Sequence, residues 1–197
     1  MFTSVKYNNV HSYIEAYAEY ILRQAKQRLK SVDATGQLSN SLYFNLIPEK
    51  EGWTLEFKSN AVSQDGEPYA DYVQKGVAGT EGSRTYIDIY GDRKFTKYKY
   101  KKGRENAPPP TALLSWIKTR GIKGRARGFT KADGTEVKGS GRFITHNSLS
   151  FAISKGIQRK GIPATSFYTQ PISWSWNLFK KGLIEDLKLD VLKYIKE

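Results

Sequence analysis

The chain has 197 residues, of which 39% are hydrophobic, and this length is sufficient for one compact domain with a core. It carries 32 Lys and Arg against 19 Asp and Glu, and the resulting net charge of +13 favours an anionic partner, either nucleic acid or an acidic protein surface. Because there is no cysteine, disulfides, thiolate metal sites and cysteine nucleophiles are excluded.

The first predicted element is an amphipathic helix over residues 9–30. Val10, Ile14 and Ile21 belong to a series of apolar residues that recur at helical spacing, with charged residues on the other faces. Gly36 follows and interrupts the chain. The pattern therefore predicts a helix of about six turns with one buried face.

Two strands and a short helix are predicted next. Apolar and polar residues alternate over 42–46 and again over 53–57, and residues 48–52 between them have the composition of a turn. This pattern predicts a β-hairpin. Residues 69–75 then read as a short helix that Gly76 ends.

The middle of the chain is basic and rich in glycine. A strand is predicted over 86–90, followed by a basic segment over 93–104 that contains two tyrosines. Thr111 is the expected N-cap of a helix over 112–120. Six glycines among basic residues predict a long loop over 121–142.

Two further helices are predicted, over 146–159 and over 175–195, with an extended segment over 165–169 between them. The predicted fold is therefore α+β. We expect a small antiparallel sheet, built on the hairpin and the later strands, to pack against a long N-terminal helix and a C-terminal helix. Long basic loops are inserted into this core.

The positive charge is concentrated between residues 92 and 131, where 13 basic residues face two acidic ones, a net +11. Tyr98 and Tyr100 alternate with lysines there, a pattern that can combine phosphate contacts with base stacking. A solvated loop and a contact with an acidic protein remain alternatives to DNA binding. The candidate contact residues are Arg93, Lys94, Lys97, Lys99, Lys101, Lys102, Arg104, Lys123, Arg125 and Arg127.

No catalytic constellation is recognisable, so we predict no enzyme, no metal and no cofactor. The two histidines, His11 and His146, are far apart in sequence and read as surface or capping residues. No zinc-protease, phosphate-loop or nucleophile-elbow spacing occurs. Asp65, Glu67 and Asp71 leave a metal-dependent nuclease as a minor alternative.

Three short motifs follow one another along the chain: T-G-x-L-x-x-S after the first helix, Y-A-x-x-V-x-x-G after the hairpin, and G-I-x-A-x-x-F followed by proline. In this order they resemble the tail-completion and head–tail-joining (neck or minor tail) proteins of tailed bacteriophages. The matching residues are Thr35, Gly36, Leu38, Ser41, Tyr69, Ala70, Val73, Gly76, Gly161, Ile162, Ala164, Phe167 and Pro171. The threonine that ends the second family motif is displaced here to Thr80, and the basic segments resemble insertions.

Because no internal repeat or linker divides the chain, we expect one domain, residues 1–197, and the resemblance implies how this domain is built. Its core would comprise 1–80, 106–120 and 143–197, with basic insertions at 81–105 and 121–142. It further implies a structural virion protein at the head–tail junction or tail, with portal, adaptor, stopper or tail-tube proteins as partners.

The same resemblance implies a homo-oligomeric ring of sixfold or twelvefold symmetry, with nonspecific contact to phage DNA as a possible role of the basic loops. The candidate subunit-interface residues are Tyr72, Gly76, Phe167 and Tyr168. Phe167 and Tyr168 are alternatively interpreted as core residues. A freestanding, sequence-nonspecific nucleic-acid-binding protein is the alternative.

No segment approaches the ~18 apolar residues of a membrane span, and no signal-peptide pattern opens the chain. We therefore expect that the protein does not associate with a membrane and that it assembles in the host cytoplasm.

Overall fold

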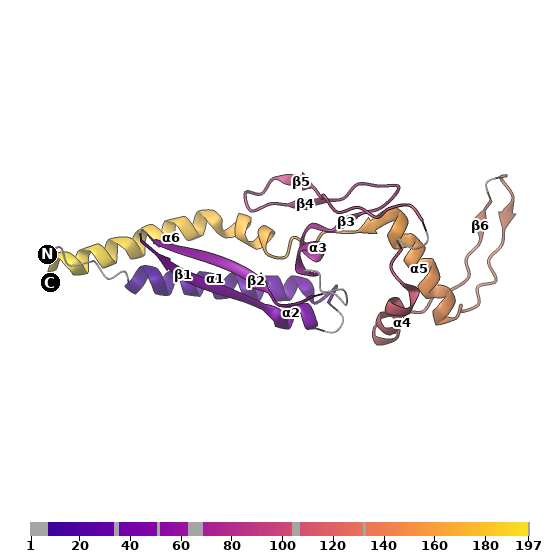
Figure 1. The fold of residues 1–197 in the computed structure, drawn as a ribbon, viewed down its shortest axis with the longest axis horizontal. Helices are drawn as coiled ribbons and strands as arrows, with labels where there is room; N and C mark the ends of the chain where they lie inside the picture. The colour runs from indigo at the N-terminus through magenta and orange to yellow at the C-terminus, as the bar shows by residue number, and fades with distance from the viewer. Residues whose placement is uncertain are drawn as a thin grey trace. The chain divides into compact units, whose positions relative to one another are not determined.

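The computed structural model describes residues 8–33, 36–50, 52–62, 69–103, 107–131 and 133–196. The fold is α+β, about 50% helix and 18% strand, with small antiparallel sheets and long helices near both ends, which confirms the predicted class (Figure 1). The chain forms two compact units. Unit 1 comprises Met1–Gly76, Thr85–Phe95 and Ala164–Glu197, and unit 2 comprises Val77–Arg84 and Thr96–Pro163. This division differs from the predicted single core with two insertions.

Unit 1 contains the two longest helices and two hairpins. Its elements are α1 Asn8–Leu29, α2 Gln37–Ser41, β1 Leu42–Glu49, β2 Gly52–Ser59, α3 Tyr69–Lys75, β4 Thr85–Ile87, β5 Arg93–Phe95 and α6 Thr169–Lys196. The strands pair antiparallel, β1 with β2 from Leu42↔Ser59 to Glu49↔Gly52 and β4 with β5. The predicted helix 9–30 and hairpin are thus confirmed.

Helices α1 and α6 lie side by side along much of their length (Figure 1). The buried residues of α1 recur every three or four positions, so one stripe of the helix faces the core. Phe179 of α6 stacks on Tyr17 and Tyr13, with ring centroids 4.1 and 5.6 Å apart. Gly182 lies so close to Tyr13 that a Cβ there would be 2.2 Å from the hydroxyl oxygen.

A buried carboxylate on α6 caps the N-terminus of α1. Asp190 is 3% exposed, and its oxygens accept hydrogen bonds from the backbone amides of Asn9 and Val10 at 3.1 and 2.9 Å and from Asn9 Nδ2 at 2.9 Å. The first amides of a helix have no partner within the helix, and the positive end of its dipole favours an anion. One residue therefore joins two helices that are about 180 positions apart in sequence.

Unit 2 contains two helices and two short strand pairs. Its elements are β3 Val77–Ala78, α4 Pro110–Thr119, β6 Phe129–Thr130, β7 Glu136–Val137, α5 His146–Lys160 and β8 Gly161–Ile162. The pair β3–β8 requires glycine, because a Cβ on Gly161 would lie 2.1 Å from the carbonyl oxygen of Val77 and its φ is +77°.

The prediction of an extended segment over residues 165–169 is wrong. The amides of Thr165 and Ser166 donate to the carbonyl oxygens of Val73 and Gln74, at the end of α3, instead of to another strand. These helix-end carbonyls have no partner within α3. Helix α6 then begins at Thr169, six residues earlier than predicted.

The sheets also differ from the prediction. The described residues form four separate two-stranded sheets instead of one sheet. The predicted strand 86–90 ends at Ile87, where a turn leads into β5. The segment 121–142 is not simply a loop, since it contains the β6–β7 hairpin. Thr111 is not the cap of α4, because Pro110 opens the helix and Pro109 stands at the cap position.

Candidate nucleic-acid interface

The two units have very different charges. Unit 1 has 15 basic and 15 acidic residues and is neutral, whereas unit 2 has 17 basic and four acidic residues and carries the whole +13. Such a density of one sign produces a strong local potential that attracts polyanions. The candidate interface is therefore a property of unit 2.

The first basic row lies beside β3. The amide of Ala78 donates to the carbonyl oxygen of Tyr98 at 2.8 Å, and the amide of Tyr100 donates to that of Ala78 at 2.9 Å. Residues 97–101 are thus held extended, and alternate side chains point to opposite sides. Lys97, Lys99 and Lys101 are exposed, while the two tyrosines are half-buried. The three lysines thus form an exposed row, while phosphate contact by the lysines and base stacking by the tyrosines stay predictions.

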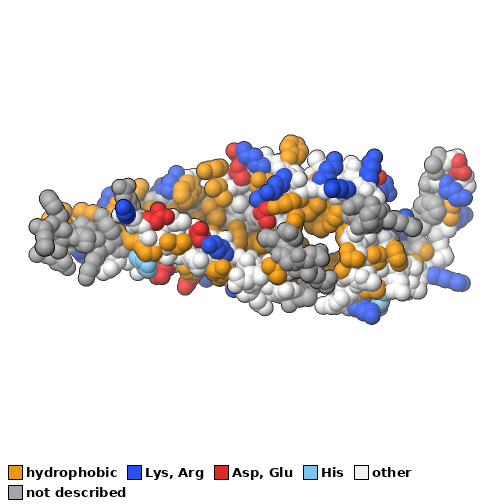
Figure 2. All heavy atoms as spheres, viewed as in Figure 1, with side chains coloured by type: hydrophobic (Ala, Val, Ile, Leu, Met, Phe, Trp, Pro, Cys, Tyr) orange, Lys and Arg blue, Asp and Glu red, His pale blue; other side chains and the backbone are white. Residues whose placement is uncertain are grey.

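The second basic row lies on the ribbon that leads to β6. The amide of Ala126 donates to the carbonyl oxygen of Arg142 at 2.9 Å, and the amide of Ile144 donates to that of Gly124 at 3.0 Å, so the segment is extended and paired. Its alternate residues Lys123, Arg125 and Arg127 are all exposed. Lys and Arg side chains are visible around the β6–β7 hairpin in Figure 2.

Small residues on the opposite face explain why this row faces outward. A Cβ on Gly124 would lie 2.8 Å from Leu149 Cδ1, and one on Gly128 would lie 2.7 Å from the carbonyl oxygen of Val137. The alternation of basic and small residues over 123–128 is therefore a strand pattern with a tightly packed inner face. The sequence carried this signal, but the glycines favoured the loop prediction.

One basic side chain of each row lies against an aromatic ring. The guanidinium of Arg125 lies 4.7 Å from the ring centroid of Phe143, and the ammonium of Lys97 lies 5.2 Å from that of Tyr98. Such cation–π contacts contribute about 0.5–1 kcal/mol at exposed sites and restrict the side chain without neutralising it. Within the described part of the chain, Lys99, Lys101, Lys123 and Arg127 form no ion pair.

The two rows contact different parts of α5. Gln158 Nε2 donates to the carbonyl oxygens of Lys101, at 3.1 Å, and Gly103, whereas Gly124 lies against Leu149. Nine helical residues separate these contacts, about 14 Å along the axis. The rows are therefore separate contact points within unit 2.

Other candidate basic residues differ from these six. Lys94 lies 3.8 Å from a carboxylate oxygen of Asp88 and 3.6 Å from one of Asp92, so acids of its own hairpin balance its charge. Arg93 lies on the same strand, in the neutral unit 1. Lys102 is exposed. The pKa of the nearby Glu81 carboxyl is lowered mainly by Arg159 and, to a smaller extent, by the charge of Lys102. Arg104 lies outside the described residues.

The candidate subunit-interface residues are mostly internal. Phe167 is 1% exposed and belongs to the core of unit 1, so it is not a surface residue. Gly76 is buried with φ +70° directly after α3. Tyr168 is half-buried, its hydroxyl donates to the carbonyl oxygen of Lys58 at 3.2 Å, and burial raises its pKa. Tyr72 is half-buried on α3.

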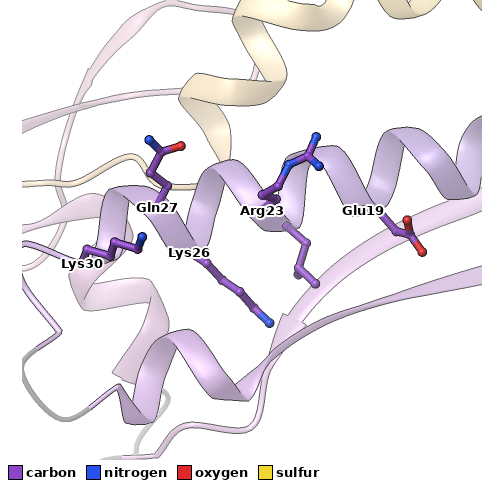
Figure 3. A pocket seen from close by; sticks show the side chains of 6 residues that line it. Glu19, Arg23, Lys26, Gln27 and Lys30 are labelled. Carbon is purple, nitrogen blue, oxygen red and sulfur yellow. The ribbon is translucent and has the colours of Figure 1, made fainter.

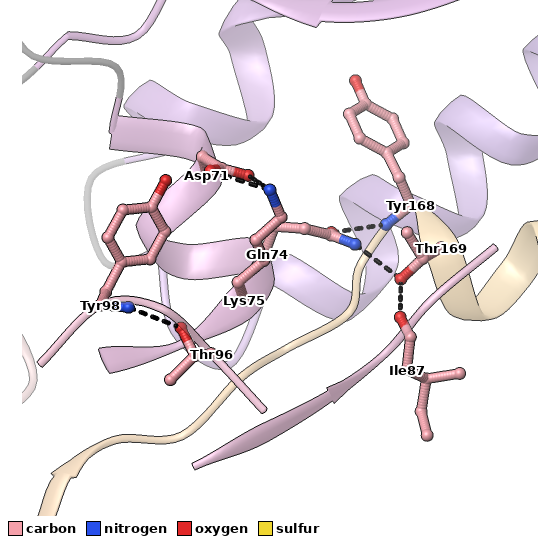
Figure 4. A network of polar contacts seen from close by, with 8 residues as sticks. All are labelled: Asp71, Gln74, Lys75, Ile87, Thr96, Tyr98, Tyr168 and Thr169. Atoms are coloured by element: carbon pink, nitrogen blue, oxygen red, sulfur yellow. Dashed lines mark hydrogen bonds and ion pairs between the residues drawn. The ribbon is translucent and has the colours of Figure 1, made fainter. Parts of the chain in front are cut away.

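A buried glutamine that the sequence analysis missed organises this region (Figure 4). The side chain of Gln74 donates to Thr169 Oγ1 at 2.6 Å and accepts from the amide of Tyr168 at 3.0 Å. Thr169 in turn donates to the carbonyl oxygen of Ile87. Two of the three motifs therefore meet in one hydrogen-bonded joint of unit 1. No local pattern distinguishes Gln74, since its partners are distant in sequence.

One surface hollow of about 360 Å³ is lined by residues of α1 and by Lys30 directly after it. In Figure 3 the side chains of Glu19, Arg23, Lys26, Gln27 and Lys30 leave this one segment in several directions. They do not converge on a common point as catalytic groups do.

The residues that the structure describes contain no group of three or more potential metal ligands. Asp71, the one acid of the nuclease alternative that is described, pairs with Lys75 at 2.8 Å. Asp65 and Glu67 lie outside the described residues. Among the described helices none has the length and apolarity of a membrane span.

Comparison with known proteins adds no assignment. No family model matches the sequence, and no curated protein and no solved structure shows significant similarity to it.

Proposed function

We propose that the protein is a structural virion component, a ring-forming tail-completion or head–tail connector (neck) subunit of a tailed bacteriophage. The ring would have sixfold or twelvefold symmetry and would lie between a portal or adaptor and a stopper or tail tube. No reaction is part of this proposal. The protein would act through the free energy of its contacts with copies of itself and with neighbouring virion proteins.

The observation that carries the proposal is the separation of two surface types. Unit 1 is neutral and exposes many large apolar side chains on α6, whereas the excess charge of unit 2 stands in exposed rows. A neutral apolar surface suits protein–protein contact, and a basic surface suits DNA or an acidic partner. The order of the three sequence motifs supplies the virion context.

Deletion of the gene in the phage tests this proposal. We expect heads and tails that fail to join in electron micrographs, and mass spectrometry of wild-type particles should detect the protein. Complementation with the intact gene is the control. Infectious particles that lack the protein would contradict the proposal.

The second candidate is a freestanding, sequence-nonspecific nucleic-acid-binding protein, which the exposed row on the β6 ribbon favours. Titration of the full chain with duplex DNA at several salt concentrations tests it. Replacing Lys123, Arg125 and Arg127 by Gln should weaken binding about tenfold and reduce the slope of log K against log salt by about 2–3.

A matched control removes the same charge from unit 1, with Gln at Arg23 and Lys26 on α1 and at Lys30 directly after it. If both triple variants lose affinity equally, the binding reflects net charge and not the row. A free monomer that binds DNA tightly and is absent from virions would favour this second candidate over the first.

A further inference from the structure

Helix α6 has more apolar surface than its packing on α1 uses. Its buried residues are Pro171, Phe179 and Asp190, of which Phe179 and Asp190 contact α1 and define the buried face. Ten large apolar or aromatic side chains elsewhere on α6 are exposed by 39 to 73%, namely Trp174, Trp176, Leu178, Ile184, Leu187, Leu189, Val191, Leu192, Tyr194 and Ile195.

The exposed aliphatic residues fall into two stripes. Stripe A consists of Ile184, Leu187, Val191 and Ile195, at spacings of three and four residues. Stripe B consists of Leu178, Leu189 and Leu192. At about 100° per residue, each stripe lies roughly 100–130° from the buried face, on opposite sides of it. Lys181 and Lys188 separate the stripes on the outermost face.

The charge distribution indicates what covers these stripes. Unit 1 is neutral, whereas unit 2 carries +13 and would repel unit 2 of another copy. Copies of this chain can therefore approach one another with least repulsion through unit 1. Helix α6 is the element of unit 1 that exposes the most large apolar side chains.

The exposed apolar area of α6 is comparable with the apolar part of a standard protein–protein interface. Full burial of one aliphatic side chain removes roughly 60–120 Å², and an aromatic one 150–250 Å². Ten such side chains, each about half exposed, present on the order of 500 Å². A standard interface buries about 800 Å² per partner, somewhat more than half of it apolar. Divided between two neighbours, this surface supplies roughly half of the apolar area of each such contact.

Two different stripes on one helix suit a head-to-tail contact. A contact that uses the same patch on both copies ends at a dimer, whereas a contact between two different patches continues to a ring or filament. We propose that stripe A of one copy packs against stripe B of the next copy, and that α6 is the subunit interface of the assembly. This inference rests on the proposed ring and names its contact surface.

Stripe variants of the full chain test the inference by light scattering after size-exclusion chromatography at micromolar concentration. Wild type should form a closed oligomer that high salt strengthens, because salt screens repulsion between the basic units. Leu187→Lys with Val191→Lys removes stripe A, and Leu189→Lys with Leu192→Lys removes stripe B. Each variant alone should be monomeric, with association weakened at least about tenfold.

Mixing the two variants gives the decisive measurement. The A-stripe variant retains stripe B and the B-stripe variant retains stripe A, so an equimolar mixture should form a dimer and nothing larger. A monomeric wild type would overturn the inference, as would a mixture that stays monomeric. If only one stripe variant loses association, the contact is self-complementary and the head-to-tail arrangement is wrong.

Two controls separate this contact from folding and from the virion role. Ile89→Lys with Tyr90→Lys adds the same two charges at exposed residues of unit 1 that are not on α6, and this variant should leave the oligomer unchanged. Circular dichroism should show wild-type helix content for every variant, since the substituted side chains are exposed. If the inference fails while gene deletion still leaves heads and tails unjoined, only the interface is wrong and the proposed function stands.

Discussion

Unit 1 and unit 2 achieve their structures by different means. Unit 1 packs long helices around aromatic and aliphatic clusters and balances its charge residue for residue. Unit 2 uses short strands held by close backbone contacts at glycines, with nearly all its charge of one sign. The self-repulsion of such a unit opposes compactness. Apolar packing of long helices therefore stabilises unit 1, whereas unit 2 combines the packing of α4 on α5 with close backbone contacts at glycines.

The largest expected effect is on the core of unit 1. Phe167→Ala removes a ring that is 1% exposed and should lower the free energy of unfolding by about 3–5 kcal/mol. Hydrogen exchange should show faster exchange throughout α1 and β1–β2. Phe151→Ala, at an exposed ring of unit 2, is the control and should change stability by less than about 0.5 kcal/mol. Equal losses for the two variants would contradict the assigned core.

Substitution of two glycines, one within α5 and one directly after it, tests what stabilises unit 2. Gly161→Ala should destabilise by about 2–4 kcal/mol, because the new Cβ would meet the Val77 carbonyl and φ is positive. Gly156→Ala has open space within the helix and should stabilise by about 0.5–1 kcal/mol. Chemical denaturation measures both. The same sign for the two variants would refute the claim that backbone contact at β3–β8 holds unit 2.

The link between α1 and α6 is tested at the buried cap. Asp190→Ala leaves the amides of Asn9 and Val10 without their carboxylate partner and should cost about 2 kcal/mol. Glu185→Ala, an exposed acid on the same helix, controls for helix charge. Exchange of the first α1 amides, followed by NMR, should accelerate only in the first variant. Unchanged protection there would show that the cap contributes nothing.

The smallest effect concerns the exposed ion pair of unit 2. The guanidinium of Arg159, 2.8 Å from Glu81, lowers the pKa of that carboxyl below its ordinary value of 4.5. A lowered pKa in the folded state gives stability that is complete above pH 4.5 and lost as the pH falls through the lowered value.

Glu81→Gln should therefore be slightly less stable than wild type at neutral pH and equal to it in strong acid. Denaturation curves at both pH values, repeated at high salt, measure this difference. A difference that grows on acidification has the wrong sign and would contradict the pairing.

Local periodicity was sufficient to predict most helices of the protein. Helix α1, the β1–β2 hairpin and most of α6 follow from apolar spacing, because each buries one face and side-chain direction repeats with the backbone. The basic character of the candidate interface was likewise visible, since formal charge depends on composition alone. All six exposed row residues lie among the predicted contacts, although the strand pattern over 123–128 was not recognised, and Arg93 and Lys94 belong to the neutral unit.

The residues that join distant segments could not be predicted from the sequence and are known from the structure alone. Asp190 caps a helix about 180 positions away, Gln74 binds Thr169, and Phe167 lies in the core instead of on the surface. The glycines of 121–142 allow close pairing of two strands, although the same residues favour loops when considered locally. Contacts between segments far apart in the chain produce no periodic sequence pattern. They depend on which segments the fold brings together, and not on the residues that are adjacent in sequence.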